Sequence, residues 1–205
     1  MAKMETLRYA NITRNSLVNG PGKRHVLHLQ GCSIKCKGCF NPHTWSDKGG
    51  KVESVYRLAW ELMSDSPSGI TISGGEPTEQ WEALKALLQE CHKHKPGLNV
   101  LVFSGVDEDG LSSSGILSEA FMPYYQSESL VNTIVSGPYD REQPSDEYLL
   151  GSKNQKILTW DGAPLLDSGP RVEVRVGKDG KVLVTGFPSK ESLNELKSNF
   201  KLGDR

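Results

Sequence analysis

Three of the four cysteines of this 205-residue chain, Cys32, Cys36 and Cys39, lie within one run of eight residues. Thiolates at such short spacing are the usual ligands of zinc and of iron–sulfur clusters. A structural zinc site and an ordinary electron-transfer 4Fe–4S cluster both take four protein ligands. The fourth cysteine, Cys91, falls on the apolar stripe of a predicted helix, where a free cysteine behaves as a small core residue. If the loop holds a four-iron cluster, one iron is therefore left open to another molecule.

A second group that could do chemistry is Gly74-Gly75-Glu76, which directly follows an apolar run. Two successive glycines allow the backbone to approach a ligand closely, and Glu76 offers a carboxylate to an ammonium group. Gly-Gly-Glu-Pro is by itself also an ordinary turn before a helix. Taken alone, the run is therefore most simply a structural turn.

Apolar runs alternate with helical patterns over most of the chain. Strands are predicted over residues 25–30, 69–73, 98–103 and 131–137. Helices are predicted over 51–64, 81–91 and 114–122. Because the strands are apolar runs rather than alternating ones, the pattern is typical of a parallel sheet covered by helices. Four such units are too few to close an eight-stranded barrel, so we predict an α/β fold with an open, partial barrel and a site at the carboxyl ends of its strands.

The pattern changes after about residue 160. Residues 172–186 alternate apolar and polar side chains around Lys178-Asp179-Gly180, which predicts a β-hairpin. Residues 189–200 then predict a terminal helix. We therefore predict a core over 1–160 and an appendage of hairpin and helix over 161–205.

The composition limits the classes of function. Hydrophobic residues make up 36% and charged residues 24% of the chain, as in soluble globular proteins. The net charge of −1 gives no indication of binding to nucleic acid or to an anionic membrane. We find no secretory signal and no apolar run that spans a bilayer. The cytoplasm, where thiols stay reduced, is the expected compartment.

The spacing C-x3-C-x2-C, followed by Phe40, resembles the signature of the radical S-adenosylmethionine (SAM) superfamily. In that superfamily the open iron of a 4Fe–4S cluster is chelated by the amino and carboxylate groups of SAM. One electron from the cluster then breaks a carbon–sulfur bond, and the resulting 5′-deoxyadenosyl radical abstracts hydrogen from a substrate. The resemblance implies that Gly74, Gly75 and Glu76 bind the methionine end of SAM. It also implies that Phe40 packs beside the adenine or the cluster, unless it is an ordinary core residue.

A narrower resemblance covers roughly residues 8 to 160. The runs over 18–45, 69–80, 135–140 and 151–157 resemble, in order and approximate spacing, the activating proteins of anaerobic ribonucleoside-triphosphate reductase. Members of this branch have a shortened barrel and make a glycyl radical on a partner enzyme by removing a glycine Cα hydrogen. In this resemblance Asn154 and Gln155 face SAM or the docked substrate. The alternative is that they cap a turn.

One strand end departs from the branch. The chain has Phe103-Ser104-Gly105-Val106 where the branch has an aromatic-Thr-Gly-Tyr run. Ser104 keeps a hydroxyl that can bond a SAM carboxylate or ribose hydroxyl, but Val106 cannot replace a tyrosine ring. This change and the appendage favour a first alternative, a radical SAM enzyme that acts on a small molecule or a peptide.

The predicted function is a radical SAM enzyme that generates a glycyl radical on a partner such as anaerobic ribonucleotide reductase. A second alternative is a non-enzymatic iron–sulfur redox module, which needs neither an open iron nor the Gly-Gly-Glu element. Basic residues near the cysteines are expected to dock an acidic electron donor such as a flavodoxin or ferredoxin. They are Lys23, Arg24, Lys35, Lys37, Lys48 and Lys51.

Overall fold

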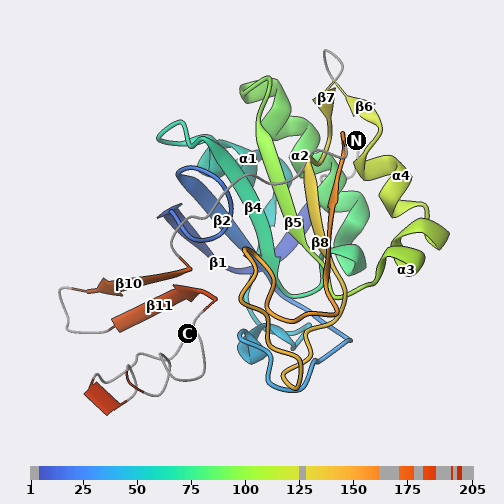
Figure 1. Cartoon of the computed structure of the whole chain (residues 1–205). Helices are drawn as coiled ribbons and strands as arrows, with labels where there is room; N and C mark the ends of the chain where they lie inside the picture. The colour runs from blue at the N-terminus through green and yellow to red at the C-terminus, as the bar shows by residue number, and fades with distance from the viewer. Residues whose placement is uncertain are drawn as a thin grey trace.

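The computed structural model describes residues 5–124, 128–161, 171–177 and 182–187, together with residues 195, 198 and 199. Its centre is a seven-stranded sheet in the order β3-β1-β2-β4-β5-β8-β9 (Figure 1). The four predicted strands are neighbours in this sheet and run parallel. They are β2 (Arg24–Leu29), β4 (Gly69–Gly74), β5 (Asn99–Phe103) and β8 (Thr133–Ser136). The predicted α/β fold with a mostly parallel sheet is confirmed.

Antiparallel strands that were not predicted flank this parallel centre. On one side β1 (Thr6–Ser16) pairs with β2 and with β3 (Lys51–Ser54), and on the other side β9 (Lys156–Thr159) pairs with β8. The predicted helix over 51–64 is therefore wrong in its first turn. The helix α1 (Val55–Met63) begins only after Ser54, whose side chain accepts a hydrogen bond from the Arg57 N–H. Backbone pairing with β1 outweighs the helical spacing of residues 51–54.

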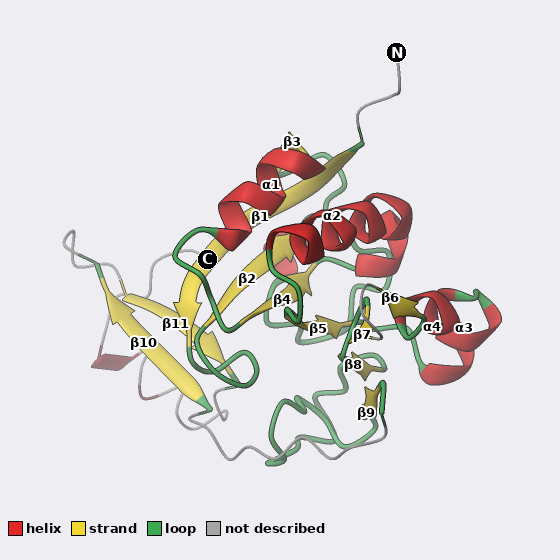
Figure 2. Ribbon diagram, turned by 90° about the horizontal axis from the view of Figure 1, so that it is seen from above, coloured by secondary structure: helices red, strands yellow, loops and turns green. Residues whose placement is uncertain are grey.

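Helices cover one face of the sheet. Figure 2 shows α1 and α2 (Trp81–His94) side by side on that face. Alternate strand residues point to the helices, because side chains alternate across a sheet. Val100, Val102 and Ile134 join the helical leucines in the main core. Leu101 and Val135 point to the opposite face, where they pack with Leu149 and Leu150.

The remaining short elements follow β5. The predicted helix over 114–122 is observed as the shorter α4 (Ile116–Ala120), and α3 (Glu108–Ser113), which was not predicted, precedes it. Gly115, with a left-handed φ of 78°, separates the two helices. Two short strands, β6 (Pro123–Tyr124) and β7 (Glu128–Ser129), form a separate ribbon. Two 3₁₀ turns, η1 (Pro42–Thr44) and η2 (Pro77–Gln80), follow the cysteine loop and Glu76. Within the described ranges, no helix combines the length and the apolarity needed to cross a membrane.

The predicted hairpin is confirmed as β10 (Val172–Val176) paired with β11 (Val182–Gly186). Its turn at Lys178-Asp179-Gly180 lies outside the described residues. So does the predicted terminal helix over 189–200, apart from residues 195, 198 and 199.

Arg24 occupies an interior position at the start of β2. Its side chain is completely buried and donates hydrogen bonds to Thr71 Oγ1 and Asn99 Oδ1, both at 2.8 Å. Burial lowers the pKa of the guanidinium to about 10. A buried group cannot contact a protein partner, so its predicted place on an electron-donor surface is wrong.

Candidate active site

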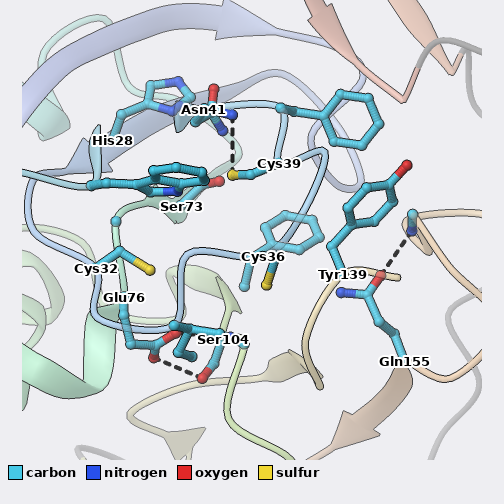
Figure 3. Close-up of a pocket in the computed structure, with 18 of the residues that line it drawn as sticks. His28, Cys32, Cys36, Cys39, Asn41, Ser73, Glu76, Ser104, Tyr139 and Gln155 are labelled. Carbon is cyan, nitrogen blue, oxygen red and sulfur yellow. Dashed lines mark hydrogen bonds between the residues drawn. The ribbon is translucent and has the colours of Figure 1, made fainter. Parts of the chain in front are cut away.

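The three clustered cysteines lie on the loop that follows β2, and their side chains line one pocket. Figure 3 shows the sulfur atoms of Cys32, Cys36 and Cys39 on different sides of that pocket. The loop coils tightly because Lys35 and Gly38 both adopt left-handed backbone angles, with φ of 50° and 83°. The sequence prediction that these thiols act together is supported by this arrangement.

The donor set fits an iron–sulfur cluster. All three thiols are soft ligands and are only partly buried, so each is accessible from the pocket. Burial raises the pKa of the Cys32 and Cys36 thiols, while backbone hydrogen bonds near Ile34 and Lys35 act in the opposite direction at Cys32. In the described part of the chain, no three His, Cys, Asp or Glu side chains are grouped as ligands of one metal ion. A cluster has a different requirement, since each thiolate binds its own iron atom.

The Gly74-Gly75 turn is in direct contact with the start of the cysteine loop. The Gly75 N–H donates to the Leu29 carbonyl and the Glu76 N–H donates to the Gly31 carbonyl, both at 2.8 Å. Gly74 has a φ of 92°, and a Cβ atom on Gly75 would lie 2.2 Å from the Gly31 carbonyl oxygen. Glycine is therefore required at both positions. The two predicted motifs form one backbone-bonded unit.

Glu76 lines the pocket and is only 3% exposed. Its Oε1 accepts hydrogen bonds from the Thr78 N–H, the Thr78 hydroxyl and the Ser104 hydroxyl. Its Oε2 accepts one, from the Gly105 N–H at 2.8 Å. Because a carboxylate has about four lone-pair positions, two on each oxygen, Oε2 keeps capacity for a bound ammonium group.

Ser104 lines the pocket, but its hydroxyl is engaged within the protein. It donates to Glu76 Oε1 at 2.8 Å and accepts from the Val106 N–H at 3.0 Å (Figure 3). This bond holds the Glu76 carboxylate in place. Val106, at the position of the missing tyrosine, packs against the main core.

The side chains of Asn154 and Gln155 both form hydrogen bonds with the backbone of the loop between β8 and β9. Asn154 Nδ2 donates to the Pro138 carbonyl at 2.8 Å, and Asn154 is not among the residues that line the pocket. Gln155 lines the pocket, but its Oε1 accepts from the Gly151 N–H and its Nε2 donates to the Gly137 carbonyl. The turn-capping alternative accounts for all of these bonds.

Aromatic residues cover another part of the pocket. Phe40 lines it and packs against Tyr139 with ring centroids 5.0 Å apart. Tyr139 was not singled out in the sequence, although it lies in the 135–140 run that resembles the activating proteins. His28 and Asn19 also line the pocket and were missed as site residues. The only sequence signal for His28 was its place on an apolar strand next to the cysteines.

Cys91 is separate from this site. It is fully buried in α2, and burial raises the pKa of its thiol to about 12. We expect Cys91→Ala to keep the iron and sulfide content of the wild type, at a cost of about 1–2 kcal/mol in the free energy of unfolding. Iron and sulfide analysis with a denaturant titration measures both. Iron loss in this variant would show that Cys91 is a ligand.

Comparison with known proteins agrees with this site. The family described as "4Fe-4S single cluster domain" matches residues 18–158. The anaerobic ribonucleoside-triphosphate reductase-activating protein of Enterobacteria phage T4 is 28% identical over 156 residues, which cover 74% of this chain and 93% of the relative. The protein of the same name from Vibrio cholerae is 30% identical over 151 residues, which cover 69% of this chain and 90% of the relative.

A second kind of activating enzyme matches over a shorter segment. The pyruvate formate-lyase-activating enzyme of Clostridium pasteurianum is 39% identical over 90 residues, which cover 41% of this chain and 38% of the relative. The family match contains all three clustered cysteines and the Gly74-Gly75-Glu76 turn. The chain therefore belongs to the 4Fe–4S single cluster domain family, among the radical SAM activating proteins of the anaerobic ribonucleoside-triphosphate reductase type.

Proposed function

We propose that this chain reductively cleaves SAM and thereby generates a glycyl radical on a partner enzyme, with anaerobic ribonucleotide reductase as the first candidate. The observation that carries the proposal is one pocket lined by Cys32, Cys36, Cys39 and the Gly74-Gly75-Glu76 turn. An electron carrier has no need of the second element. The names of the relatives support the same reaction class.

In this proposal, different residues of the pocket bind the cluster and SAM. The three thiolates would hold a 4Fe–4S cluster, and the Gly74-Gly75 turn with Glu76 would hold the methionine end of SAM. When bound, the cluster and SAM supply the one-electron chemistry that yields a 5′-deoxyadenosyl radical. Ser104 donates to Glu76 Oε1 and so holds the carboxylate, whose Oε2 would accept from the ammonium group. Phe40 and its neighbour Tyr139 would pack beside the adenine and exclude water from this side of the pocket.

The surrounding fold would suit a protein substrate. In this proposal the parallel strands are a partial radical SAM barrel over residues 1–160, with 161–205 as an appendage. A barrel with few strands is open at one side, which would admit a glycine-bearing loop of the partner. The free cysteines support the cytoplasm as its compartment, because thiols stay reduced there.

The electron donor would dock over the cysteine loop. Lys35, Lys37 and Lys48 are exposed there, and Lys35 and Lys48 line a second hollow that also reaches Cys32 and Trp45. The three lysines outnumber the two carboxylates of the hollow, Asp47 and Glu79, and this excess of positive charge would steer an acidic flavodoxin or ferredoxin to the surface.

Charge reversal tests this docking surface. We expect the double change Lys35→Glu and Lys48→Glu to slow cluster reduction by reduced flavodoxin about tenfold at low salt, because steering is lost. Lys23 was predicted to be part of this surface, but it precedes β2, at the end of the strand away from Cys32, so the exposed Lys23→Glu serves as a single-charge control. Stopped-flow bleaching of the cluster absorbance gives the rates. Equal slowing with dithionite would point to damage at the cluster and count against docking.

The direct test of function uses the reconstituted protein without oxygen. SAM, dithionite and the anaerobic ribonucleotide reductase of the source organism are added, and 5′-deoxyadenosine and the electron paramagnetic resonance signal of a glycyl radical are measured. We expect both products, and neither when SAM is omitted. Cleavage of SAM with no radical on the reductase would favour a different substrate. No cleavage by a protein with a complete cluster would favour a redox module.

A further inference from the structure

The C-terminal hairpin contributes to the same pocket as the cysteines. Thr185, Gly186 and Phe187 line it, although the family match ends at residue 158. Figure 2 shows the hairpin on the side of the sheet opposite to helices α1 and α2. This chain therefore brings a segment of its own to the site.

One strand of the hairpin is tied to the end of β1. The Arg175 guanidinium donates to the carbonyl oxygens of Arg14 and Asn15 at 2.7 and 2.8 Å. Glu173 Oε2 accepts from the Leu17 N–H at 3.3 Å, and Glu173 also pairs with Arg175. The hairpin is thus anchored at one border of the parallel strands.

A second anchor lies on the loop between β8 and β9. The Arg171 guanidinium donates to the carbonyl oxygens of Ser145, Asp146 and Glu147, at 3.0, 2.6 and 2.6 Å. Hydrogen bonds from a charged donor are stronger than neutral ones. The hairpin therefore bridges the two sides of the open sheet.

The contact between the hairpin and Asn19 shows how far the hairpin lies from the cysteine loop, along the direction of the strands. Asn19 Nδ2 donates to Thr185 Oγ1 at 3.1 Å, and the Asn19 carbonyl accepts from Thr71 Oγ1 at 2.7 Å. Thr71 is two residues before Ser73 in β4, or roughly 7 Å along the strand. The cysteine loop and Gly74 lie at the strand end. The hairpin is therefore at the floor of the pocket and the cofactor-binding residues are at its rim.

Phe187 is packed against other apolar residues at this floor. Its ring packs on Phe103 with centroids 5.7 Å apart, next to Leu101 and Val135. The preceding Gly186 has a φ of 97°, and a Cβ atom there would lie 2.2 Å from the Arg171 carbonyl oxygen. The Phe187 ring is nevertheless only partly buried, so part of it faces the pocket.

We infer that the hairpin forms the floor of the substrate part of this pocket, where Phe187 contacts the glycine-bearing segment of the protein partner. The inference rests on the proposed function. This part of the pocket is lined by uncharged side chains, two aromatic and two polar: Phe103, Phe187, Asn19 and Thr185. Such a mixture suits an extended backbone whose glycine is flanked by uncharged side chains, because aromatic faces pack on backbone and small side chains while amide and hydroxyl groups fix its orientation.

The test compares Phe187→Ala with Val176→Ala, a matched change on an exposed side chain of the same hairpin. The first readout is the affinity of the cluster-loaded protein, without SAM, for the fluorescently labelled reductase of the source organism. The second is the yield of glycyl radical per 5′-deoxyadenosine. We expect Phe187→Ala to weaken reductase binding about tenfold, as loss of a buried aromatic contact does, and to lower the yield. SAM affinity, measured by calorimetry, stays within about twofold because the rim is intact.

The outcomes separate the two proposals. Wild-type binding and yield in Phe187→Ala would overturn the floor assignment and leave the proposed function standing. A parallel fall in SAM affinity would also overturn it, by placing Phe187 at the cofactor. No glycyl radical with the wild type would instead contradict the proposed function. Thermal melts check that each variant folds. If Phe187→Ala does not fold, Phe187→Leu, which keeps an apolar contact, replaces it. We expect Phe187→Leu to bind the reductase about threefold more weakly.

Discussion

Replacing Cys36 with alanine is expected to abolish SAM cleavage. Cys36 lines the pocket together with Cys32 and Cys39, whereas the remaining cysteine, Cys91, is buried in α2 and does not line it, so no spare thiol is available to replace Cys36. Loss of an outer-shell partner of a metal site costs about 10–100-fold in metal affinity or activity, and loss of a direct ligand costs at least as much. We therefore expect 5′-deoxyadenosine to fall by about a hundredfold or more.

The measurement is 5′-deoxyadenosine formed under anoxic conditions, together with iron per chain. Cys91→Ala is the matched control, because it removes a thiol from the core instead of the pocket. The control should retain both cluster and product. A Cys36→Ala protein that keeps four irons and cleaves SAM at the wild-type rate would contradict the assignment of the loop.

Gly75→Ala has the second largest expected effect. The added Cβ would lie 2.2 Å from the Gly31 carbonyl oxygen, which also accepts the hydrogen bond of the Glu76 N–H. A backbone atom cannot rotate away as a side chain can, so the turn and the cysteine loop must separate. Such overpacking costs about 2 kcal/mol of unfolding free energy. Because Glu76 moves with the turn, SAM should bind at least about tenfold more weakly, a change worth about 1.4 kcal/mol.

Gly115→Ala separates this effect from the general cost of adding a methyl group. A Cβ atom on Gly115 would meet no neighbouring atom within 4 Å in the described parts of the chain, but the φ of Gly115 is 78°. Its substitution should cost about 1–2 kcal/mol through backbone strain alone and leave SAM affinity unchanged. Denaturant titration and calorimetry with the reconstituted proteins measure the two quantities. Equal SAM affinity for Gly75→Ala and the wild type would show that the contact with Gly31 does not shape the binding site.

The chemistry at the rim of the pocket could be predicted from the order of the amino acids. Cys32, Cys36 and Cys39 lie within one loop and line one pocket, so their grouping depends on local spacing alone. The parallel strands were equally predictable, because a strand buried on both faces must be apolar along its whole length. The hairpin over 172–186 was predictable for the complementary reason, since its two strands alternate around a turn.

Segments whose state depends on distant partners were harder to predict. Residues 51–54 have a helical spacing, yet they pair with residues of β1 that lie 42 to 48 positions earlier in the chain. Arg24 stands among basic residues in the sequence, but its hydrogen bonds to Thr71 and Asn99 place it inside the sheet. Neither pairing leaves a local pattern.

Two features could be identified only in the folded structure: the hydrogen bonds that hold the rim residues in place, and the residues that lie beneath the rim. The bond from Ser104 to Glu76 joins the ends of two neighbouring strands, so the sequence could suggest both residues as ligands but not the contact between them. Phe187 reaches Phe103 across more than 80 residues of chain. Motifs depend on local spacing and are visible in the sequence. The walls of a pocket depend on packing between segments remote in the chain, and this packing exists only once the sheet has formed.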